Sequence, residues 1–201
     1  MRTIKTAPNV CESVLQEAGL SPVAGVDEAG RGPLAGPVVA CALILPPGLI
    51  IQGVNDSKAL SPSRRAILAD KIKTAAVAYS YGIVDAATID KINIHKSALE
   101  AMARAVDGLS VSPKVALVDG KFPPPVSCLT LCLVKGDSHS HLIAAASILA
   151  KVARDGIMQD LHNIYPLYGF DKHNGYGTAA HREAIKQYGA CKEHRVSYKL
   201  V

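Results

Sequence analysis

The sequence contains no tryptophan, and aromatic residues of any kind make up only 4% of its 201 residues. Proteins that bind single-stranded nucleic acid on rows of stacked aromatic side chains need more of them, so this class is disfavoured. Long apolar runs are also missing: the longest, residues 37–51, is interrupted by Pro46 and Pro47 and is too short to cross a bilayer. The first 20 residues carry four charges and no apolar stretch, unlike a secretion signal. We therefore expect a cytoplasmic protein that does not enter a membrane.

The five cysteines are an odd number and contain no CxxC pair, which favours free thiols over a disulfide framework. Cys128 and Cys132, with His139 and His141 nearby, raise the alternative of a zinc site. Residues 126–134 have the pattern of a strand, however, and along a strand two positions four residues apart lie roughly 13 Å apart, too far to share one ion. We expect both cysteines to be small core side chains.

The rest of the composition is that of a folded α/β domain, with 49% hydrophobic and 19% charged residues. The net charge is 22 − 17 = +5, and residues 172–201, with six basic and two acidic side chains, supply +4 of it. Three histidines lie in the same segment. A basic end of the chain indicates contact with a polyanion, although a solvated surface helix would have the same composition.

Apolar runs and helical spacings alternate along the chain. Continuous apolar runs predict strands at residues 23–26, 38–45, 75–84, 115–118 and 126–134. Apolar residues spaced by three and four predict helices at residues 61–73, 86–105, 178–188 and from Ser138 or Ser140 to 158. This order predicts a mixed α/β domain in which helices cover one sheet.

Acidic residues follow three of the predicted strands. Asp27 and Glu28 follow the first strand, Asp119 the fourth and Asp137 the fifth. Strand ends are where open α/β sheets place ligand-binding groups. Because clustered carboxylates repel one another, the simplest neutralising partner is a divalent cation with oxygen ligands, Mg²⁺ or Mn²⁺. Two such ions roughly 4 Å apart would activate water for hydrolysis of a phosphoryl group.

Asp27 and Glu28 are adjacent, and adjacent residues of a regular strand face opposite sides of a sheet. Both reach one site if the strand breaks there, which we expect from the turn that begins at Ala29. The turn Gly30-Arg31-Gly32 lets the backbone approach a ligand closely and offers a guanidinium to a phosphate. A plain glycine-rich hairpin turn is the alternative.

Ser147, Lys151 and Asp155 recur at every fourth position of a predicted helix and so share one face. Beside an acidic metal site, Lys151 would contact phosphate, and Asp155 would lie in the outer shell around the metal ligands. The alternative is a simple surface ion pair between Lys151 and Asp155. Tyr176 lies between two glycines just ahead of the last predicted helix. It is either a packing anchor or a substrate contact.

The segment 25–38, Gly-Val-Asp-Glu-Ala-Gly-Arg-Gly-Pro-Leu-Ala-Gly-Pro-Val, resembles the opening signature of the type 2 ribonucleases H, specifically bacterial ribonuclease HII. The similarity covers nearly the whole chain from about residue 22, in order. It continues through Asp56-Ser57-Lys58, Val118-Asp119-Gly120, Lys135-Gly136-Asp137, the helix segment Ala144–Asp155, Gly175-Tyr176-Gly177-Thr178 and His194-Arg195-Val196-Ser197-Tyr198.

This resemblance implies a ribonuclease H-like α/β fold, a five-stranded mixed sheet flanked by helices with a helical C-terminal extension. Residues 22–160 would form the catalytic domain, residues 161–201 an extension that contributes to substrate binding, and residues 1–21 an N-terminal segment. The enzyme would hydrolyse the RNA strand of RNA–DNA hybrids. It would also nick duplex DNA 5′ to a single ribonucleotide, leaving 3′-hydroxyl and 5′-phosphate ends, in ribonucleotide repair and RNA primer removal. We expect a monomer that needs no protein partner.

The resemblance also assigns the acidic residues. Asp27, Glu28, Asp119 and Asp137 would be the metal-binding and catalytic carboxylates, and Asp155 would be a further acid near the site. The cofactor would be Mn²⁺ or Mg²⁺, with two ions at the reacting phosphate.

The same resemblance assigns the substrate contacts. Gly30, Arg31 and Gly32 would contact the ribose 2′-hydroxyl and nearby phosphates, and Tyr176 would stack on the deoxyribose next to the RNA–DNA junction. Tyr198 stands where the family commonly has Phe, which we expect to be a packing variant. The substrate-binding set would be completed by Lys58, Ser147 and Lys151.

Two other functions fit parts of the sequence. One is a catalytically silent domain that binds nucleic acid on the same scaffold, although a pure binder has no reason to present carboxylates to phosphate. The other is a Mg²⁺-dependent phosphatase acting on small molecules, which would turn over nucleotide monophosphates and ignore duplexes.

Overall fold

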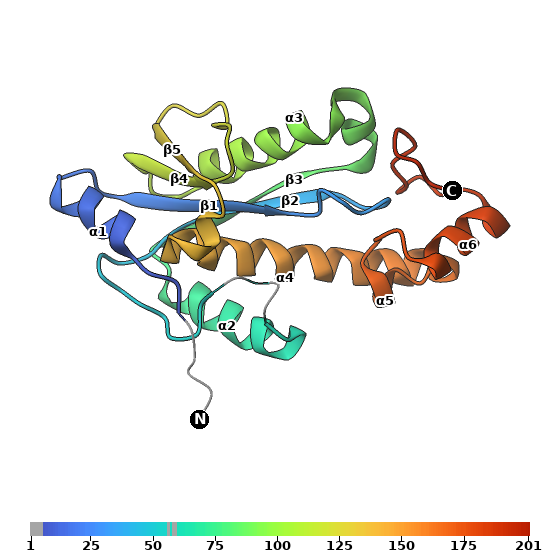
Figure 1. The fold of residues 1–201 in the computed structure, drawn as a ribbon, viewed down its shortest axis with the longest axis horizontal. Helices are drawn as coiled ribbons and strands as arrows, with labels where there is room; N and C mark the ends of the chain where they lie inside the picture. The colour runs from blue at the N-terminus through green and yellow to red at the C-terminus, as the bar shows by residue number, and fades with distance from the viewer. Residues whose placement is uncertain (1–5, 56, 58–59) are drawn as a thin grey trace.

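The computed structural model of the protein describes residues 6–55, 57 and 60–201. In this part of the chain five strands form one sheet in the order β3-β2-β1-β4-β5 (Figure 1). The first three strands pair antiparallel, whereas β4 and β5 run parallel to β1. The strands are β1 (Val23–Ala29), β2 (Val38–Ile44), β3 (Ala78–Val84), β4 (Val115–Asp119) and β5 (Leu129–Leu133). The predicted five-stranded mixed sheet is confirmed.

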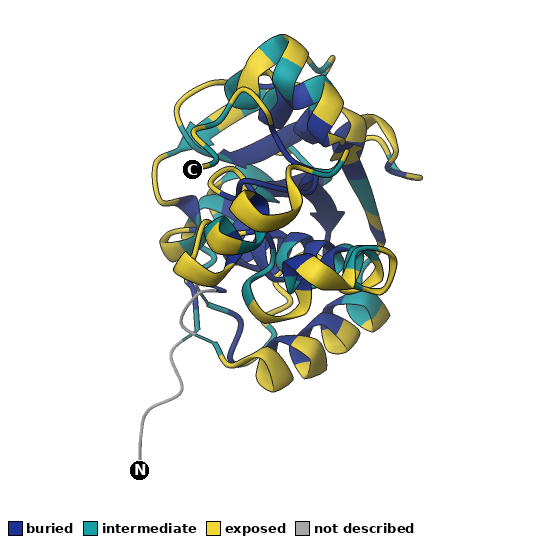
Figure 2. Cartoon of the chain, turned by 90° about the vertical axis from the view of Figure 1, so that its right-hand side faces the viewer, coloured by how far each residue is buried: buried dark blue, intermediate teal, exposed yellow. Residues whose placement is uncertain are grey.

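Helices cover both faces of this sheet. On one face α4 (His141–Ile164) packs against β1 and β2, and α2 (Pro62–Ala75) packs on α4. On the other face α3 (Ala86–Asp107) covers β2 and β3. Figure 2 shows buried strands at the centre of the molecule and exposed positions on the outer sides of the helices. The buried strands are β1, β2 and β4, whereas β3 and β5 keep exposed positions. Because helices lie on both faces, β2 is buried along its whole length and reads as a continuous apolar run.

The helices begin where polar side chains cap them. Ser61, Asp85, Ser140 and Thr178 each accept a hydrogen bond from the backbone N–H three residues further on. Of the two predicted caps for α4, Ser140 is the one used. This helix continues to Ile164, so the expected boundary after residue 160 falls inside its last turn. No helix in the described residues is long and apolar enough to cross a membrane.

A short helix near the N-terminus, α1 (Val10–Glu17), was not predicted from the sequence. Its Glu12 is buried, and Oε1 accepts hydrogen bonds from the Ser140 hydroxyl at 2.6 Å and the Leu142 N–H at 2.9 Å. One carboxylate from the start of the chain therefore secures the beginning of α4. A contact across 128 residues leaves no local signal, which is why the periodicity of the sequence did not reveal it.

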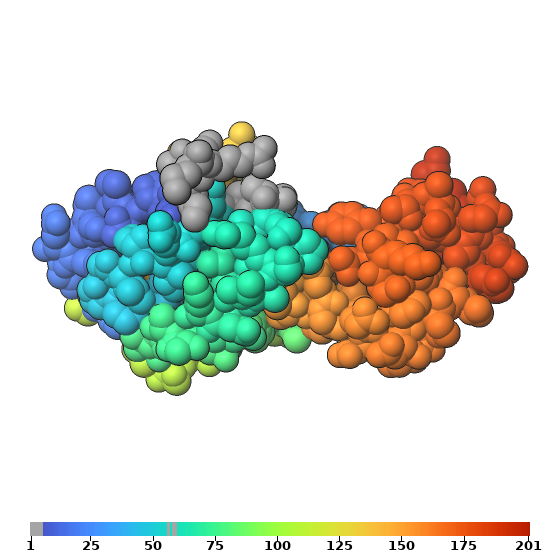
Figure 3. All heavy atoms as spheres, turned by 90° about the horizontal axis from the view of Figure 1, so that it is seen from below, coloured from blue at the N-terminus to red at the C-terminus, as the bar shows by residue number. Residues whose placement is uncertain are grey.

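The end of the chain forms a small helical layer beyond α4. Figure 3 shows it at one end of the molecule, in orange to red. It contains η3 (Pro166–Tyr168), α5 (Phe170–His173) and α6 (Ala179–Tyr188). A separate apolar cluster holds it to the loop between β1 and β2, with members Leu34, Ala35, Met158, Tyr168, Phe170 and Ile185.

The histidines of this layer are core groups rather than part of a cationic surface. His181 and His194 are buried, and their Nε2 atoms lie 3.1 Å apart. Burial lowers the pKa of His181 to about 4, so its ring is neutral at physiological pH. The sequence had grouped these histidines with the basic residues as a sign of polyanion contact, and for His181 and His194 that interpretation is wrong.

Cys128 and Cys132, the alternative zinc ligands, lie beside the core. Cys128 and Cys132 are partly buried and pack against the apolar cluster between the sheet and α3. Burial raises the pKa of both thiols, as it does for cysteines that serve as small apolar side chains.

We expect Glu12→Ala to lower the free energy of unfolding by about 1–3 kcal/mol, because it leaves the buried Leu142 N–H and the Ser140 hydroxyl without their acceptor. Urea denaturation measures this loss. Glu17→Ala, at an exposed position of the same helix, is the control and should change stability little. Equal losses for both variants would show that α1 is not held through Glu12.

Candidate active site

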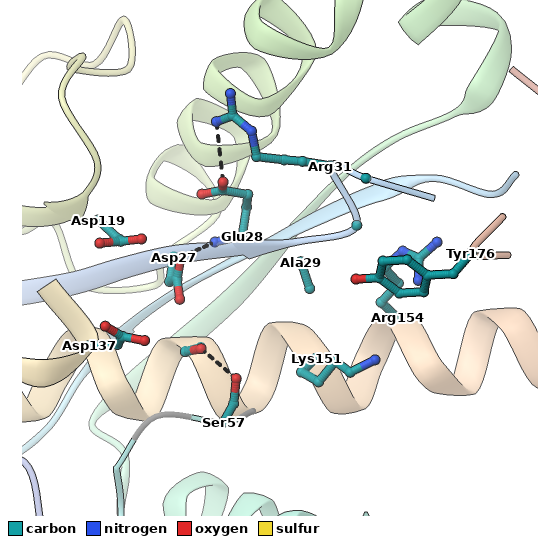
Figure 4. Close-up of a pocket in the computed structure, with 13 residues that line it drawn as sticks. Asp27, Glu28, Ala29, Arg31, Ser57, Asp119, Asp137, Lys151, Arg154 and Tyr176 are labelled. Carbon is teal, nitrogen blue, oxygen red and sulfur yellow. Dashed lines mark hydrogen bonds and ion pairs between the residues drawn. The ribbon is translucent and has the colours of Figure 1, made fainter. Parts of the chain in front are cut away.

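Four carboxylates gather at one edge of the sheet because the elements that carry them end there. Asp27 and Glu28 lie near the end of β1, and Asp119 is the last residue of β4, the parallel neighbour of β1. Asp137 lies in η2 (Gly136–Ser138), just after β5. All four line one cavity of about 280 Å³. Figure 4 shows Asp119 and Asp137 grouped with Asp27 around the end of β1.

The strand does not break at the acidic pair, which corrects the expectation from the sequence. β1 stays paired with β2 through Ala29, so Asp27 and Glu28 keep opposite directions. In Figure 4 Asp27 points toward α4, whereas Glu28 points the other way, toward Arg31. Both still line the cavity, because the cavity extends around the end of the strand and is lined from both faces.

Hydrogen bonds fix the geometry of the acidic cluster. Asp119 Oδ1 accepts the Gly136 N–H at 2.7 Å, which ties the loop that carries Asp137 to the end of β4. Asp27 Oδ1 accepts the N–H of the next residue, Glu28, at 2.7 Å. Arg31 Nη1 lies 3.3 Å from Glu28 Oε1 in an ion pair.

The electrostatics of the cluster favour an added positive charge. Asp27 is buried, and burial together with the charges of Glu28 and Asp119 raises its pKa well above the ordinary value. Burial also raises the pKa of Glu28, although the Arg31 guanidinium acts in the opposite direction. Oε2 of Glu28 is buried and has no hydrogen-bond partner among the described residues.

A divalent cation fits this chemistry, since it would relieve the repulsion and give the orphaned Glu28 oxygen a partner. The described residues contain no three acidic, histidine or cysteine side chains already close enough to hold a metal. A bound cation would therefore have to draw the carboxylates closer together.

The glycine-rich turn forms the next part of the cavity wall. Gly30 has φ +101°, and a Cβ there would lie 2.2 Å from Arg154 Nε, so only glycine fits. A Cβ on Gly32 would lie 3.6 Å from Tyr176 Cε1, which shows how closely the Tyr176 ring approaches the turn. Tyr176 remains 47% exposed, so its ring is accessible to a substrate.

Helix α4 supplies the opposite wall. Ser147 and Lys151 line the cavity, and the hydroxyl oxygens of Ser147 and Ser57 lie 2.8 Å apart in a buried hydrogen bond. Asp155 does not line the cavity; its Oδ1 is 2.6 Å from Lys151 Nζ and its Oδ2 is 3.9 Å from Arg65 Nη2. Of the three residues predicted to share one face of this helix, Ser147 and Lys151 line the cavity and Asp155 does not.

Lys58 lies outside the described residues. Three residues that the sequence did not assign to the site also line the cavity: Ala29, Ser57 and Arg154. For Arg154 a signal existed: it continues the four-residue spacing of Ala146 and Ala150 on the buried face of α4, where an arginine is out of place.

The chain is similar to known proteins in sequence and in fold. A family model described as ribonuclease HII matches residues 24–201. A protein named ribonuclease HII from Chlamydia abortus is 52% identical over 192 residues, covering 94% of this chain and 89% of its own. The crystal structure of ribonuclease H2 from Pyrococcus horikoshii OT3 has a TM-score of 0.72 and 27% identity, covering 89% of this chain and 94% of that one. A structure of Bst ribonuclease HIII in complex with Mn²⁺ has a TM-score of 0.69 at 19% identity, covering 94% and 71%, which supports the fold alone.

Replacing Asp27 by Asn should stabilise the protein in the absence of divalent cations, by an amount that grows as the pH rises from 4 to 8. Because the pKa of Asp27 is raised on folding, the native state holds its proton more tightly than the unfolded chain. The stability of the parent should therefore fall as the pH rises from about 4 through the raised pKa, a loss that Asn escapes.

Urea denaturation in EDTA at pH 4 to 8 measures the difference between the two proteins. Asp160→Asn, at an exposed position of α4, is the matched control and should show no difference that grows with pH. The proposed repulsion would be contradicted if the difference in the free energy of unfolding between the parent and Asp27→Asn did not change with pH over this range.

Proposed function

The chain belongs to the ribonuclease HII family, endonucleases that act on the RNA of RNA–DNA hybrids, and we propose that it also nicks duplex DNA 5′ to a single embedded ribonucleotide. The products would be 3′-hydroxyl and 5′-phosphate ends. Such a reaction serves ribonucleotide repair and RNA primer removal. The cofactor would be a divalent cation, Mn²⁺ or Mg²⁺, with two ions at the reacting phosphate.

The observation that carries this proposal is the group of four carboxylates at one edge of the sheet, with the raised pKa values of Asp27 and Glu28. Buried acids that repel one another cost stability unless a bound cation compensates them. The ions would be held by Asp27, Glu28, Asp119 and Asp137. When bound, they supply an activated water and stabilisation of the leaving oxygen.

Basic side chains beside the acids would hold the phosphates of the scissile strand. Arg31 is exposed at the cavity and is bound to Glu28 through one guanidinium nitrogen, which leaves other donors for phosphate. Lys151 lies on the opposite wall and is oriented by Asp155. Asp155 would therefore act on the substrate through Lys151. Lys58 stays a prediction from the sequence.

Recognition of the ribonucleotide would come from the turn 30–32 and from Tyr176. The turn presents backbone atoms to the cavity, where they would contact the ribose 2′-hydroxyl, the group that distinguishes RNA from DNA. Tyr176, beside Gly32, would stack on the deoxyribose that follows. Since Tyr176 belongs to the segment 161–201, this extension would contribute to substrate binding as well as to the fold.

The experiment that tests this function uses a DNA duplex with one ribonucleotide, incubated with Mg²⁺ or Mn²⁺. We expect a single nick 5′ to the ribonucleotide and at least a hundredfold slower nicking, about 3 kcal/mol, for Asp119→Asn, with the fold unchanged by circular dichroism. Asp107→Asn, an exposed carboxylate at the end of α3, should cleave as the parent does.

The outcomes separate the alternatives. Tight binding of the hybrid without cation-stimulated cleavage would identify a silent binding domain. Turnover of nucleotide monophosphates with no action on duplexes would identify a phosphatase. Full activity of Asp119→Asn would remove this carboxylate from the mechanism.

A further inference from the structure

Two arginines are buried behind the glycine-rich turn. Arg195 is 0% and Arg154 1% exposed. In the described residues neither forms an ion pair with a carboxylate, and their guanidinium groups donate mainly to backbone carbonyl oxygens. A buried charge of this kind is costly, so it indicates that the backbone it holds needs a fixed conformation.

Arg195 holds the turn itself. Its Nη2 donates to the carbonyl oxygen of Gly30 at 2.7 Å and its Nη1 to that of Arg31 at 3.0 Å. Its Nε and Nη2 both donate to Gly36, at 3.0 and 2.8 Å. Arg195 follows α6 and is anchored by its own N–H, which donates to the Leu34 carbonyl at 2.8 Å. The C-terminal segment thus holds the turn directly, because Arg195 and Gly30 are 165 positions apart in the sequence.

The direction of these carbonyls determines the direction of the neighbouring N–H groups. In a planar trans peptide the C=O of one residue and the N–H of the next point in opposite directions. With the carbonyls of Gly30 and Arg31 bound to Arg195, the N–H groups of Arg31 and Gly32 point away from it. Neither N–H donates to any acceptor in the described residues. The turn lines the cavity and Arg195 does not, so these two donors face the substrate side.

Tyr198 supports the same arrangement. Its hydroxyl donates to the Arg31 carbonyl at 3.0 Å and lies 3.3 Å from Arg195 Nη1. The Arg195 guanidinium carbon lies 5.3 Å from the centre of the Tyr198 ring. The sequence predicted only a packing variant of Phe at this position. The hydroxyl has two specific partners, so this prediction was incomplete.

Arg154 secures the flanks of the turn from α4. Its donors reach the carbonyl oxygens of Pro37 at 3.0 Å, Ala35 at 3.1 Å and Asn174 at 3.0 Å. Asn174 begins the loop that carries Tyr176, so Arg154 also fixes the distance between this loop and the turn.

We infer that Arg195, supported by the Tyr198 hydroxyl, is a positioning residue that aims the N–H groups of Arg31 and Gly32 at the 2′-hydroxyl of the substrate. This inference rests on the proposed function and assigns its specificity to the C-terminal segment. Loss of the Arg195 contacts weakens discrimination between ribonucleotide and deoxyribonucleotide. It leaves the general affinity for duplex DNA, which comes from phosphate contacts, largely intact.

The test compares Arg195→Lys and Tyr198→Phe with the parent. Lysine keeps the charge but cannot donate to three carbonyls in the fixed planar arrangement of a guanidinium. Phe removes only the hydroxyl. Fluorescence anisotropy in EDTA gives the affinity for a duplex with one ribonucleotide and for the all-DNA duplex of the same sequence.

We expect the preference for the ribonucleotide duplex to fall about tenfold in Arg195→Lys and about threefold in Tyr198→Phe, the range of one or two hydrogen bonds. Affinity for the all-DNA duplex should change little. In cleavage assays KM should rise more than kcat falls. The matched control is Arg182→Lys, since Arg182 also donates to carbonyls in this segment, those of Lys199 and Leu200, but does not touch the turn.

The inference would be overturned if both variants kept the parent's preference for the ribonucleotide duplex. It would also be overturned if they lost affinity equally for the ribonucleotide and all-DNA duplexes. If Arg195→Lys fails to fold by urea denaturation, Tyr198→Phe decides the question alone. A parent that neither cleaves nor distinguishes the two duplexes would instead contradict the proposed function.

Discussion

Repulsion among the carboxylates that surround the buried Asp27 is the constraint on which the rest of this structure depends. Asp27 and Asp119 stand side by side because β1 and β4 are parallel neighbours in register, and Asp137 is tied in by the hydrogen bond from Gly136 to Asp119. Burial then raises the pKa of Asp27, since the sheet and α4 exclude water from it. The rigid sheet prevents these acids from moving apart. Binding of a divalent cation would relieve their repulsion, and this relief favours binding.

The substrate side of the cavity depends on contacts from the other end of the chain. Gly30 lies against Arg154 of α4, while Arg195 and Tyr198 from the C-terminal segment hold the carbonyls of the turn. The apolar cluster around Phe170 fixes this segment to the loop between β1 and β2. The sheet thus positions the acidic cluster. The turn 30–32, which we propose contacts the 2′-hydroxyl, is positioned by residues of the segment 161–201 as well.

Much of this arrangement follows from the sequence, because apolar runs mark buried strands and acids at their ends mark the sheet edge. The fold class and the gathering of Asp27, Glu28, Asp119 and Asp137 at one cavity were predicted in this way. The positions of Glu12, Arg154 and Arg195 were not, since hydropathy places charged residues outside and their partners are far away in sequence. The opposite directions of Asp27 and Glu28 also required the structure, which shows that β1 pairs through Ala29.

The most direct measurement is anomalous X-ray scattering from crystals soaked in Mn²⁺ at a concentration that supports cleavage. We expect an anomalous peak between Asp27, Glu28, Asp119 and Asp137, within coordination distance of their carboxylate oxygens, with the side chains drawn closer together than in the free protein. A protein that cleaves under these conditions while its Mn²⁺ peaks lie elsewhere, or while this cavity shows none, would contradict the account.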